Sequence, residues 1–190
     1  GYCSFWNRGQ AMTKRAFKKF DRSPRDFYRT PPAAVEALLP HLPPETTYIE
    51  PMAGDGALVE ALDENAVCLG AYDIEPQAGW ILQGDVFDIF DCKADMFITN
   101  PPWERKFLHK AIDHLSSLAP VWLLFDSDWC HTKQAEPYLD YCEIIQSVGR
   151  VKWFGNSVGF DNCAWHLFDK NYQKTTQFFG RKPYEKMVDV

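Results

Sequence analysis

The residues with the most specific chemistry are those at positions 100–103 (NPPW), which follow an apolar stretch at 95–99. Asn100 has a side-chain carbonyl that accepts hydrogen bonds, and the two prolines stiffen the turn and orient its backbone carbonyls. The amide oxygen of Asn100 and the carbonyl of Pro101 form a pair of acceptors that matches the two hydrogens of an exocyclic amino group. Trp103 adds a flat face on which a base can stack. We therefore interpret this segment as a site for a planar ring that carries an amine.

A glycine-containing turn at 50–56 (EPMAGDG) indicates a second part of a ligand site. Gly54 and Gly56 let the backbone turn tightly and approach a ligand closely, and the helix expected after them offers free N–H groups. The turn lacks the G-x-G-x-x-G pattern, and no Lys-Ser/Thr pair follows it. The sequence therefore disfavours a dinucleotide site or a nucleotide phosphate site.

Two further acids follow short apolar stretches. Asp73 comes after 67–72 and can accept two hydrogen bonds from a ribose diol. Asp85 comes after 80–83 and can accept a hydrogen bond from an adenine amino group, which the neighbouring Phe87 would cover. Taken alone, Asp73 and Asp85 are also explained as loop acids, and Phe87 as a core aromatic.

The elements that must position these residues follow from the alternation of apolar stretches with helical patterns. Thr30 is expected to cap a helix whose first turn holds Pro31. Because strands alternate with helices, we expect a parallel sheet covered on both faces, to which the last two strands add an antiparallel edge. The site segments end strands, where open α/β sheets bind ligands. The expected strands are 47–50, 67–72, 80–83, 95–99, 121–125, 144–154 and 164–168, and the other expected helices are 57–65, 107–118 and 134–141.

The composition limits the class of protein. The 190 residues are 46% hydrophobic, as in one globular domain, and no run of eighteen apolar residues predicts a membrane helix. The net charge of −6 conceals a division, because the segments 1–30 and 150–190 are basic and 31–149 is acidic. The six cysteines have no zinc-site spacing, so we expect no metal site and free thiols in a reducing cytoplasm.

Together these motifs resemble the class I S-adenosylmethionine-dependent methyltransferases, and specifically the DNA adenine-N6 methyltransferases. Residues 50–56 resemble the cofactor loop of that family, and 100–103 resemble its catalytic [D/N/S]-P-P-[Y/F/W] motif. Residues 26–32 (DFYRTPP) resemble the segment that closes over the cofactor's methionine part. The resemblance covers about residues 21–170, in the gamma order of motifs. The compact length and residues 161–168 (DNCAWHLF) are similar to small phage-encoded members.

The resemblance implies a Rossmann-like class I methyltransferase fold, with a mostly parallel seven-stranded sheet, an antiparallel edge strand and helices on both faces. We expect a leader at 1–11 outside the fold, a basic arm and cofactor-closing segment at 12–30, a catalytic domain at 31–175 and a basic tail at 176–190. The implied reaction is methyl transfer to the N6 amino group of adenine in DNA, in the cytoplasm of a bacterium or a phage-infected cell.

The resemblance also assigns roles to single residues. Asn100 and Pro101 would hold the target amine, next to Pro102, and Trp103 would stack on the target base. By their place after the expected strand at 121–125, Trp129 and His131 could border the target pocket, although His131 is more typical of a loop histidine than of a catalytic one. The residues that would bind S-adenosylmethionine are Phe27, Tyr28, Thr30, Glu50, Pro51, Met52, Ala53, Gly54, Gly56, Asp73, Ile74, Asp85, Val86, Phe87 and Asn100.

DNA contacts are expected from basic and polar residues outside that site. Little chain follows the catalytic motif for direct base readout, so we expect short or relaxed sequence specificity. Binding should fade with salt, because it depends on local basic patches. The candidates are Lys18, Lys19, Arg22, Arg25, Arg105, Lys106, Lys152 and Asn156.

Several alternatives remain open at this stage. The same acceptor pair fits the N4 amine of cytosine in DNA, adenine in structured RNA, or a protein glutamine. A catalytically inactive methyltransferase-like module that binds DNA or a partner is a further alternative. The oligomeric state is not predicted.

Overall fold

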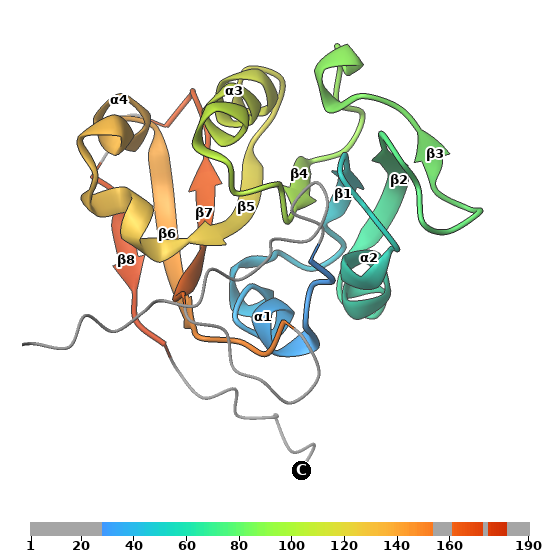
Figure 1. Cartoon of the computed structure of the whole chain (residues 1–190), viewed down its shortest axis with the longest axis horizontal. Helices are drawn as coiled ribbons and strands as arrows, with labels where there is room; N and C mark the ends of the chain where they lie inside the picture. Colours follow the sequence, from blue (N-terminus) through green and yellow to red (C-terminus); the bar gives the residue numbers. More distant parts are fainter. Residues whose placement is uncertain (1–27, 154–160, 173–174, 182–190) are drawn as a thin grey trace, which may run out of the picture.

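The structure is a computed structural model that describes residues 28–153, 161–172 and 175–181. Its sheet has eight strands, in the order β3-β2-β1-β4-β5-β7-β6-β8 (Figure 1). The strands are β1 (Thr47–Glu50), β2 (Val67–Asp73), β3 (Leu82–Gln83), β4 (Met96–Thr99), β5 (Val121–Asp126), β6 (Cys142–Gly149), β7 (Cys163–Phe168) and β8 (Gln177–Phe179).

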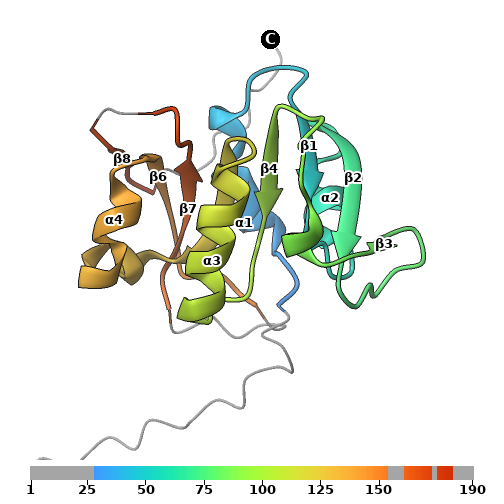
Figure 2. The ribbon, with the colours of Figure 1, turned by 90° about the horizontal axis from the view of Figure 1, so that it is seen from above.

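Helices cover both faces of this sheet (Figures 1 and 2). One face packs on α1 and α2 through a core that includes Trp122 and Leu124 of β5. The other packs on α3 through Leu123 and Phe125, the alternate residues of the same strand, as the period of two requires. The helices are α1 (Pro32–Glu36), α2 (Ala57–Leu62), α3 (Arg105–Ser116) and α4 (Glu136–Leu139), and the 3-10 turns are η2 (Leu39–His41), η3 (Val86–Asp88), η4 (Ser127–His131) and η5 (Lys133–Ala135).

The predicted fold class is confirmed, with two differences in the sheet. Strands β3, β2, β1, β4 and β5 are mutually parallel, and β7 is antiparallel to both β5 and β6. The antiparallel strand β7 therefore lies inside the sheet, between β5 and β6, and not at its edge. An eighth strand, β8, pairs with β6 in parallel and forms the edge.

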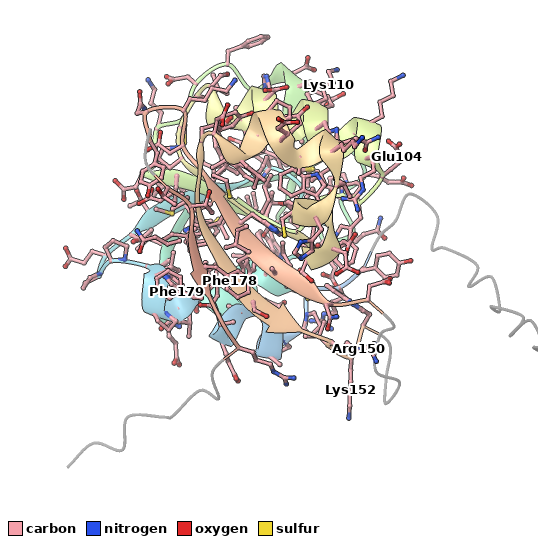
Figure 3. All side chains as sticks on the ribbon, turned by 90° about the vertical axis from the view of Figure 1, so that its left-hand side faces the viewer. Glu104, Lys110, Arg150, Lys152, Phe178 and Phe179 are labelled. Carbon is pink, nitrogen blue, oxygen red and sulfur yellow. The ribbon has the colours of Figure 1, made fainter. Side chains whose placement is uncertain are left out.

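Strand β8 lies in the segment that the sequence assigned to the basic tail. Three residues are too few to show a strand period, and the pairing that defines β8 joins Ile145 to Phe178, far along the chain. Figure 3 shows Phe178 and Phe179 on this strand. The ring of Phe179 lies 4.9 Å from that of His41, between centroids, which ties β8 to η2.

Two helix starts differ from the prediction. Thr30 does not cap α1, since the N-cap is Pro31, with extended backbone, and no side chain caps this helix. A residue before a proline is pushed toward extended conformations, so Pro32 is the first helical residue. Helix α3 begins two residues before the predicted Phe107, because the carboxylate of Glu104 accepts hydrogen bonds from the backbone N–H groups of Lys106 and Phe107.

The described cysteines are free thiols, as predicted: Cys68, Cys92, Cys130, Cys142 and Cys163. A membrane-crossing helix, long and apolar enough to span a bilayer, is not found among the described residues.

His166 of β7 is a fully buried titratable residue in an aromatic cluster. Its ring stacks on Phe125 at 3.9 Å between centroids, with an interplanar angle of 9°, and Trp129 and Phe168 lie close by. Burial lowers the pKa of His166 from 6.5 to about 3, because a charged imidazolium would lose its hydration there.

We expect this shift to make the protein sensitive to acid. The unfolded chain takes up a proton on this histidine below about pH 6.5 and the folded chain does not. The free energy of unfolding should therefore fall as the pH drops from 6.5 toward 3, by up to ~1.4 kcal/mol per pH unit from this residue. Urea unfolding from pH 8 to pH 4 should show a shallower loss for His166→Leu than for the natural protein. An equal loss of stability with pH in the two proteins would show that His166 is not the source of the acid sensitivity.

Candidate functional site

A cavity of about 1180 Å³ lies at the carboxyl ends of β1, β2 and β4. The segments that the sequence predicted to form a ligand site meet there. The predicted residues that line the cavity are Tyr28, Thr30, Glu50, Pro51, Met52, Ala53, Gly54, Asp73, Ile74, Asp85, Val86, Phe87, Asn100 and Pro102. Gly56, Pro101 and Trp103 are not among the lining residues.

The glycine turn is fixed to the end of β2 by hydrogen bonds. The backbone N–H of Gly54 donates to Oδ2 of Asp73 at 2.8 Å, and that of Ala53 donates to the carbonyl of Tyr72 at 2.8 Å. The other oxygen of Asp73, Oδ1, accepts from the N–H of Glu75 at 2.8 Å. Each carboxylate oxygen can accept a second hydrogen bond. Asp73 therefore holds the loop in place and keeps acceptor capacity for a ligand hydroxyl.

Gly56 is the N-cap of α2 and lies in the left-handed region, with φ of +87°. A Cβ on this residue would lie 2.2 Å from Cζ2 of Trp80. The position thus requires glycine for its backbone conformation and for the close approach of the indole.

Glu50 is a buried acid in the cavity wall, with 2% of its surface exposed. Its Oε2 has no hydrogen-bond partner among the described residues. Burial raises the pKa of Glu50 well above its usual value, and the nearby charges of Asp73 and Asp55 raise it further. A buried carboxyl without a partner is costly, so this position favours a cationic ligand group beside it.

Asp85 and Phe87 form another part of the wall. Oδ1 of Asp85 accepts from the backbone N–H of Phe87 at 3.0 Å, so Oδ2 keeps its capacity to accept a hydrogen bond from a ligand. The Phe87 ring meets the Phe107 ring edge-on at 5.4 Å between centroids, and Nζ of Lys110 lies 3.7 Å from its centroid. Figure 3 shows where Lys110 lies on α3. The ring is therefore held on two sides.

Asn100 follows β4 and has partners on both ends of its amide. Nδ2 donates to the backbone carbonyl of Tyr28 and to Oγ1 of Thr30, both at 3.2 Å. Oδ1 accepts from Nε1 of Trp103 at 3.3 Å, and the same N–H faces the carbonyl of Leu124 at 3.1 Å. The amide is therefore oriented by the protein.

Trp103 is half-buried and packs against both core clusters. Its ring meets that of Trp153 edge-on, at 5.4 Å between centroids and an interplanar angle of 86°. Trp153 in turn meets the ring of Tyr28 at 6.1 Å. Trp153, which the sequence did not single out, thus links the N-terminal segment to the segment at 100–103.

Several cavity residues were missed by sequence reasoning. Arg29, assigned to the basic arm, places Nε 3.3 Å from Asp55 and Nη2 3.1 Å from Glu60. Nothing in the sequence signals these pairs, because their partners are 26 and 31 residues away. Glu104 and Phe107 could have been found, since they directly follow the motif at 100–103. The other missed lining residues are Ala57, Leu58 and Gln77. Asp55, which lies within the predicted cofactor loop, and Glu75, which follows the predicted Asp73 and Ile74, also line the cavity.

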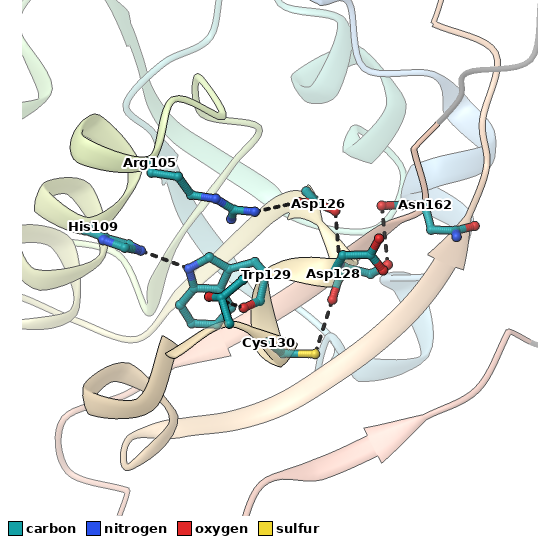
Figure 4. Close-up of polar contacts among 9 residues, drawn as sticks. Arg105, His109, Asp126, Asp128, Trp129, Cys130 and Asn162 are labelled. Carbon is teal, nitrogen blue, oxygen red and sulfur yellow. Dashed lines mark hydrogen bonds and ion pairs between the residues drawn. The ribbon is translucent and has the colours of Figure 1, made fainter. Parts of the chain in front are cut away.

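The residues predicted to contact DNA differ in their exposure and in their ion pairs. Arg105 is paired with Asp126 at 2.6 Å and is half-buried, as Figure 4 shows, so its charge is neutralised within the protein. Lys106 and Lys152 are exposed, and Figure 3 shows Lys152 beside Arg150. Phe27, Lys18, Lys19, Arg22, Arg25 and Asn156 lie outside the described residues.

The expectation that Trp129 borders a target pocket is wrong. Its side chain is fully buried, and Nε1 donates to Nε2 of His109 at 2.9 Å (Figure 4). An indole with its N–H satisfied inside an aromatic cluster is a core residue. His131, on the same turn, is exposed and does not line the cavity.

Within the described residues, no group of three or more His, Cys, Asp or Glu side chains could hold a metal ion.

Comparisons with known proteins agree with this architecture. The chain matches no family model and no curated protein. It is similar to the solved structure of a dimethyladenosine transferase from Plasmodium falciparum, at 15% identity and a TM-score of 0.50, over 76% of this chain and 63% of that one. It is also similar to an E. cuniculi complex responsible for methylation of the translation termination factor eRF1, at 13% identity and a TM-score of 0.53, over 72% and 92%.

A third similar structure is the M protein of the type I restriction enzyme EcoKI, at 11% identity and a TM-score of 0.52, over 74% of this chain and 43% of that one. The chain thus spans less than two thirds of the Plasmodium protein and of the EcoKI protein. At these identities the likeness concerns the fold. The chain has the Rossmann-like fold of the class I S-adenosylmethionine-dependent methyltransferases.

We expect Gly56→Ala to destabilise the protein, because alanine in a left-handed conformation costs about 1–2 kcal/mol and its Cβ displaces Trp80. The matched control is Gly79→Ala in the neighbouring loop, where a Cβ meets nothing within 4 Å. Urea unfolding should show a lower midpoint for the first variant only. Equal midpoints for the two variants would show that the turn does not require glycine.

Proposed function

We propose that the chain transfers a methyl group from S-adenosylmethionine to the N6 amino group of adenine in DNA, with short or relaxed sequence specificity. The observation that carries this proposal is the oriented amide of Asn100 in the wall of a cavity that also holds Glu50, Asp73 and Asp85. We further propose that the reaction takes place in the cytoplasm of a bacterium or a phage-infected cell.

The polar side chains of the cavity fit S-adenosylmethionine. The unpartnered carboxyl oxygen of Glu50 matches a cationic part of the cofactor, and the remaining acceptor positions on Asp73 match ribose hydroxyls. Oδ2 of Asp85 matches the adenine amino group, next to the apolar side chains of Ile74 and Phe87. The cavity of about 1180 Å³ exceeds the roughly 300–1,000 Å³ of ordinary small-molecule pockets. This volume is large enough for S-adenosylmethionine.

The residues at 100–103 would prepare the acceptor amine. S-adenosylmethionine supplies an electrophilic methyl group on a positively charged sulfur. The lone pair of an aromatic amine is delocalised into its ring, so an acceptor on each N–H draws the nitrogen toward tetrahedral geometry. Asn100 Oδ1 and the Pro101 carbonyl would be those acceptors. Asparagine is no base, so the proton would leave to water after transfer, and most of the rate enhancement comes from positioning.

Features outside the cavity favour nucleic acid as the substrate. Lys106 and Lys152 are exposed cations, suited to phosphate contacts, and the basic residues of the segment at 12–27 add to them. One similar structure is a dimethyladenosine transferase, and another belongs to a restriction enzyme. In duplex DNA the adenine would first be flipped out, at a cost of roughly a few kcal/mol.

The proposal is tested by labelled methyl transfer. We expect radioactive S-adenosylmethionine to label DNA, and nucleoside mass spectrometry to find N6-methyladenine in it. Asn100→Ala should lower the transfer rate by at least ~100-fold, since an oriented electrostatic contact to the reacting group is lost. Cofactor binding, measured by calorimetry, should survive. Asn65→Ala, on the exposed end of the loop after α2, is the control and should keep full activity.

Other products would change the assignment. N4-methylcytosine, labelled RNA or labelled protein would each replace adenine in DNA as the substrate. Absence of both transfer and cofactor binding would contradict the enzyme and favour a binding module.

We expect cofactor affinity to depend on the ionisation of Glu50. Its pKa is raised in the folded protein, and a cation beside it favours the charged form. Binding should therefore release a proton at pH values below that pKa, and affinity should rise with pH until Glu50 is ionised. Calorimetry in buffers of different ionisation enthalpy measures this release. Glu50→Gln should bind more weakly and lose the proton release, whereas unchanged release would assign it to another group.

A further inference from the structure

Both N–H groups of the Asn100 amide are already used by the N-terminal segment 28–30. One donates to the carbonyl of Tyr28 and the other to the hydroxyl oxygen of Thr30. A backbone carbonyl can only accept a hydrogen bond, so the nitrogen end of the amide must face Tyr28. The oxygen end therefore faces the other way, toward Trp103.

This arrangement leaves the amide oxygen as the end that can accept a hydrogen bond from a ligand. The single N–H of Trp103 is shared between Oδ1 of Asn100 and the carbonyl of Leu124, at 3.3 and 3.1 Å. An amide oxygen has two lone pairs, so Oδ1 keeps one for a ligand. Hydrogen bonds donated by the NH₂ end also polarise the amide and strengthen its oxygen as an acceptor.

The segment 28–30 is held by contacts that do not involve Asn100. Arg29 pairs with Asp55 and Glu60, and Thr30 is 6% exposed. Helix α1 starts two residues later, and the indole N–H of Trp165 donates to the carbonyl of Ala34 at 2.8 Å in the core. The two acceptors are therefore placed by the fold, and Asn100 adapts to them.

We propose that Thr30 and the Tyr28 carbonyl are positioning groups for Asn100, which fix its oxygen as the acceptor for the target amine and make asparagine obligatory at position 100 of this chain. This inference rests on the proposed function of the site. The family pattern allows aspartate at this position, whereas here an aspartate would place a carboxylate oxygen against the Tyr28 carbonyl. Two acceptors in contact without a proton are unfavourable, so the aspartate would have to be protonated.

The first test separates the hydroxyl from the bulk of Thr30. Thr30→Val keeps the shape and removes the acceptor, and Thr30→Ser keeps the acceptor. We expect kcat to fall roughly five- to tenfold for valine, as for the loss of one hydrogen bond of about 1 kcal/mol, with recovery in the serine variant. For valine, the loss should be larger in kcat than in the KM for S-adenosylmethionine.

The matched control is Thr46→Val. Thr46 is equally buried, and its hydroxyl donates to the carbonyl of Pro43 at 2.6 Å, before β1 and away from the cavity residues. Its kcat should equal that of the natural protein. An undiminished kcat in Thr30→Val, or the same loss in Thr30→Val and Thr30→Ser, would overturn the proposal.

The second test uses pH. We expect Asn100→Asp to be nearly inactive at pH 8 and to gain activity as the pH falls, because its protonated acid can donate to the Tyr28 carbonyl. A merely structural effect would not follow the titration of the new carboxyl group. Full activity of this variant at pH 8 would show that asparagine is not obligatory.

A third measurement does not depend on activity. In ¹H–¹⁵N spectra, the side-chain amide protons of Asn100, assigned with Asn100→Ala, should exchange slowly with water. In Thr30→Val one of the two should exchange at least tenfold faster. If the protein methylates nothing but this pattern is present, the proposed function fails and the positioning network stands. If it methylates DNA and both protons exchange freely, the network is wrong.

Discussion

The hydrogen bond from the Gly54 N–H to the carboxylate of Asp73 fixes the geometry on which the site depends. It joins the turn after β1 to the end of β2, and these two parallel strands are neighbours in the sheet. Once the turn is fixed, Glu50 lies buried at its start and α2 leaves from Gly56 at its end. The other wall of the cavity, at Asn100, follows β4 on the far side of β1. The carboxyl ends of three adjacent strands thus determine where the chemistry can occur.

The features that could be predicted from the sequence are local. Composition alone identifies β5, from its five apolar residues at 121–125, and the turn, from the glycines after Glu50. The acids that follow strands line the cavity because the carboxyl ends of parallel strands meet at one edge of the sheet. The missed features depend on distant pairings. Arg29 meets Asp55 only in the folded chain, and β8 exists because it pairs with β6. The position of Trp129 after β5 predicted a place near the site, but an aromatic cluster holds it in the core.

The same geometry brings together some of the acids from the middle of the chain. Glu50, Asp55 and Asp73 lie close enough that the two aspartates raise the pKa of the glutamate. Such a cluster destabilises the empty protein, because each charge opposes the next and burial removes hydration. A cationic ligand bound beside these acids would offset this loss of stability. Part of the acidic excess behind the total charge of −6 therefore comes from acids that line the cavity and not from the surface that would meet nucleic acid.

Two kinds of residue therefore surround the cavity, and they contribute differently. Oε2 of Glu50 has no hydrogen-bond partner among the described residues, and a bound cation would compensate for the cost of burying this carboxyl group. Asn100 has all its amide hydrogens satisfied before any substrate arrives, so little reorganisation is required of it. A preorganised acceptor acts in the reaction, whereas an unpaired acid selects what binds. The two should consequently respond differently to substitution, with the catalytic rate following Asn100 and its positioning groups and the affinity following Glu50.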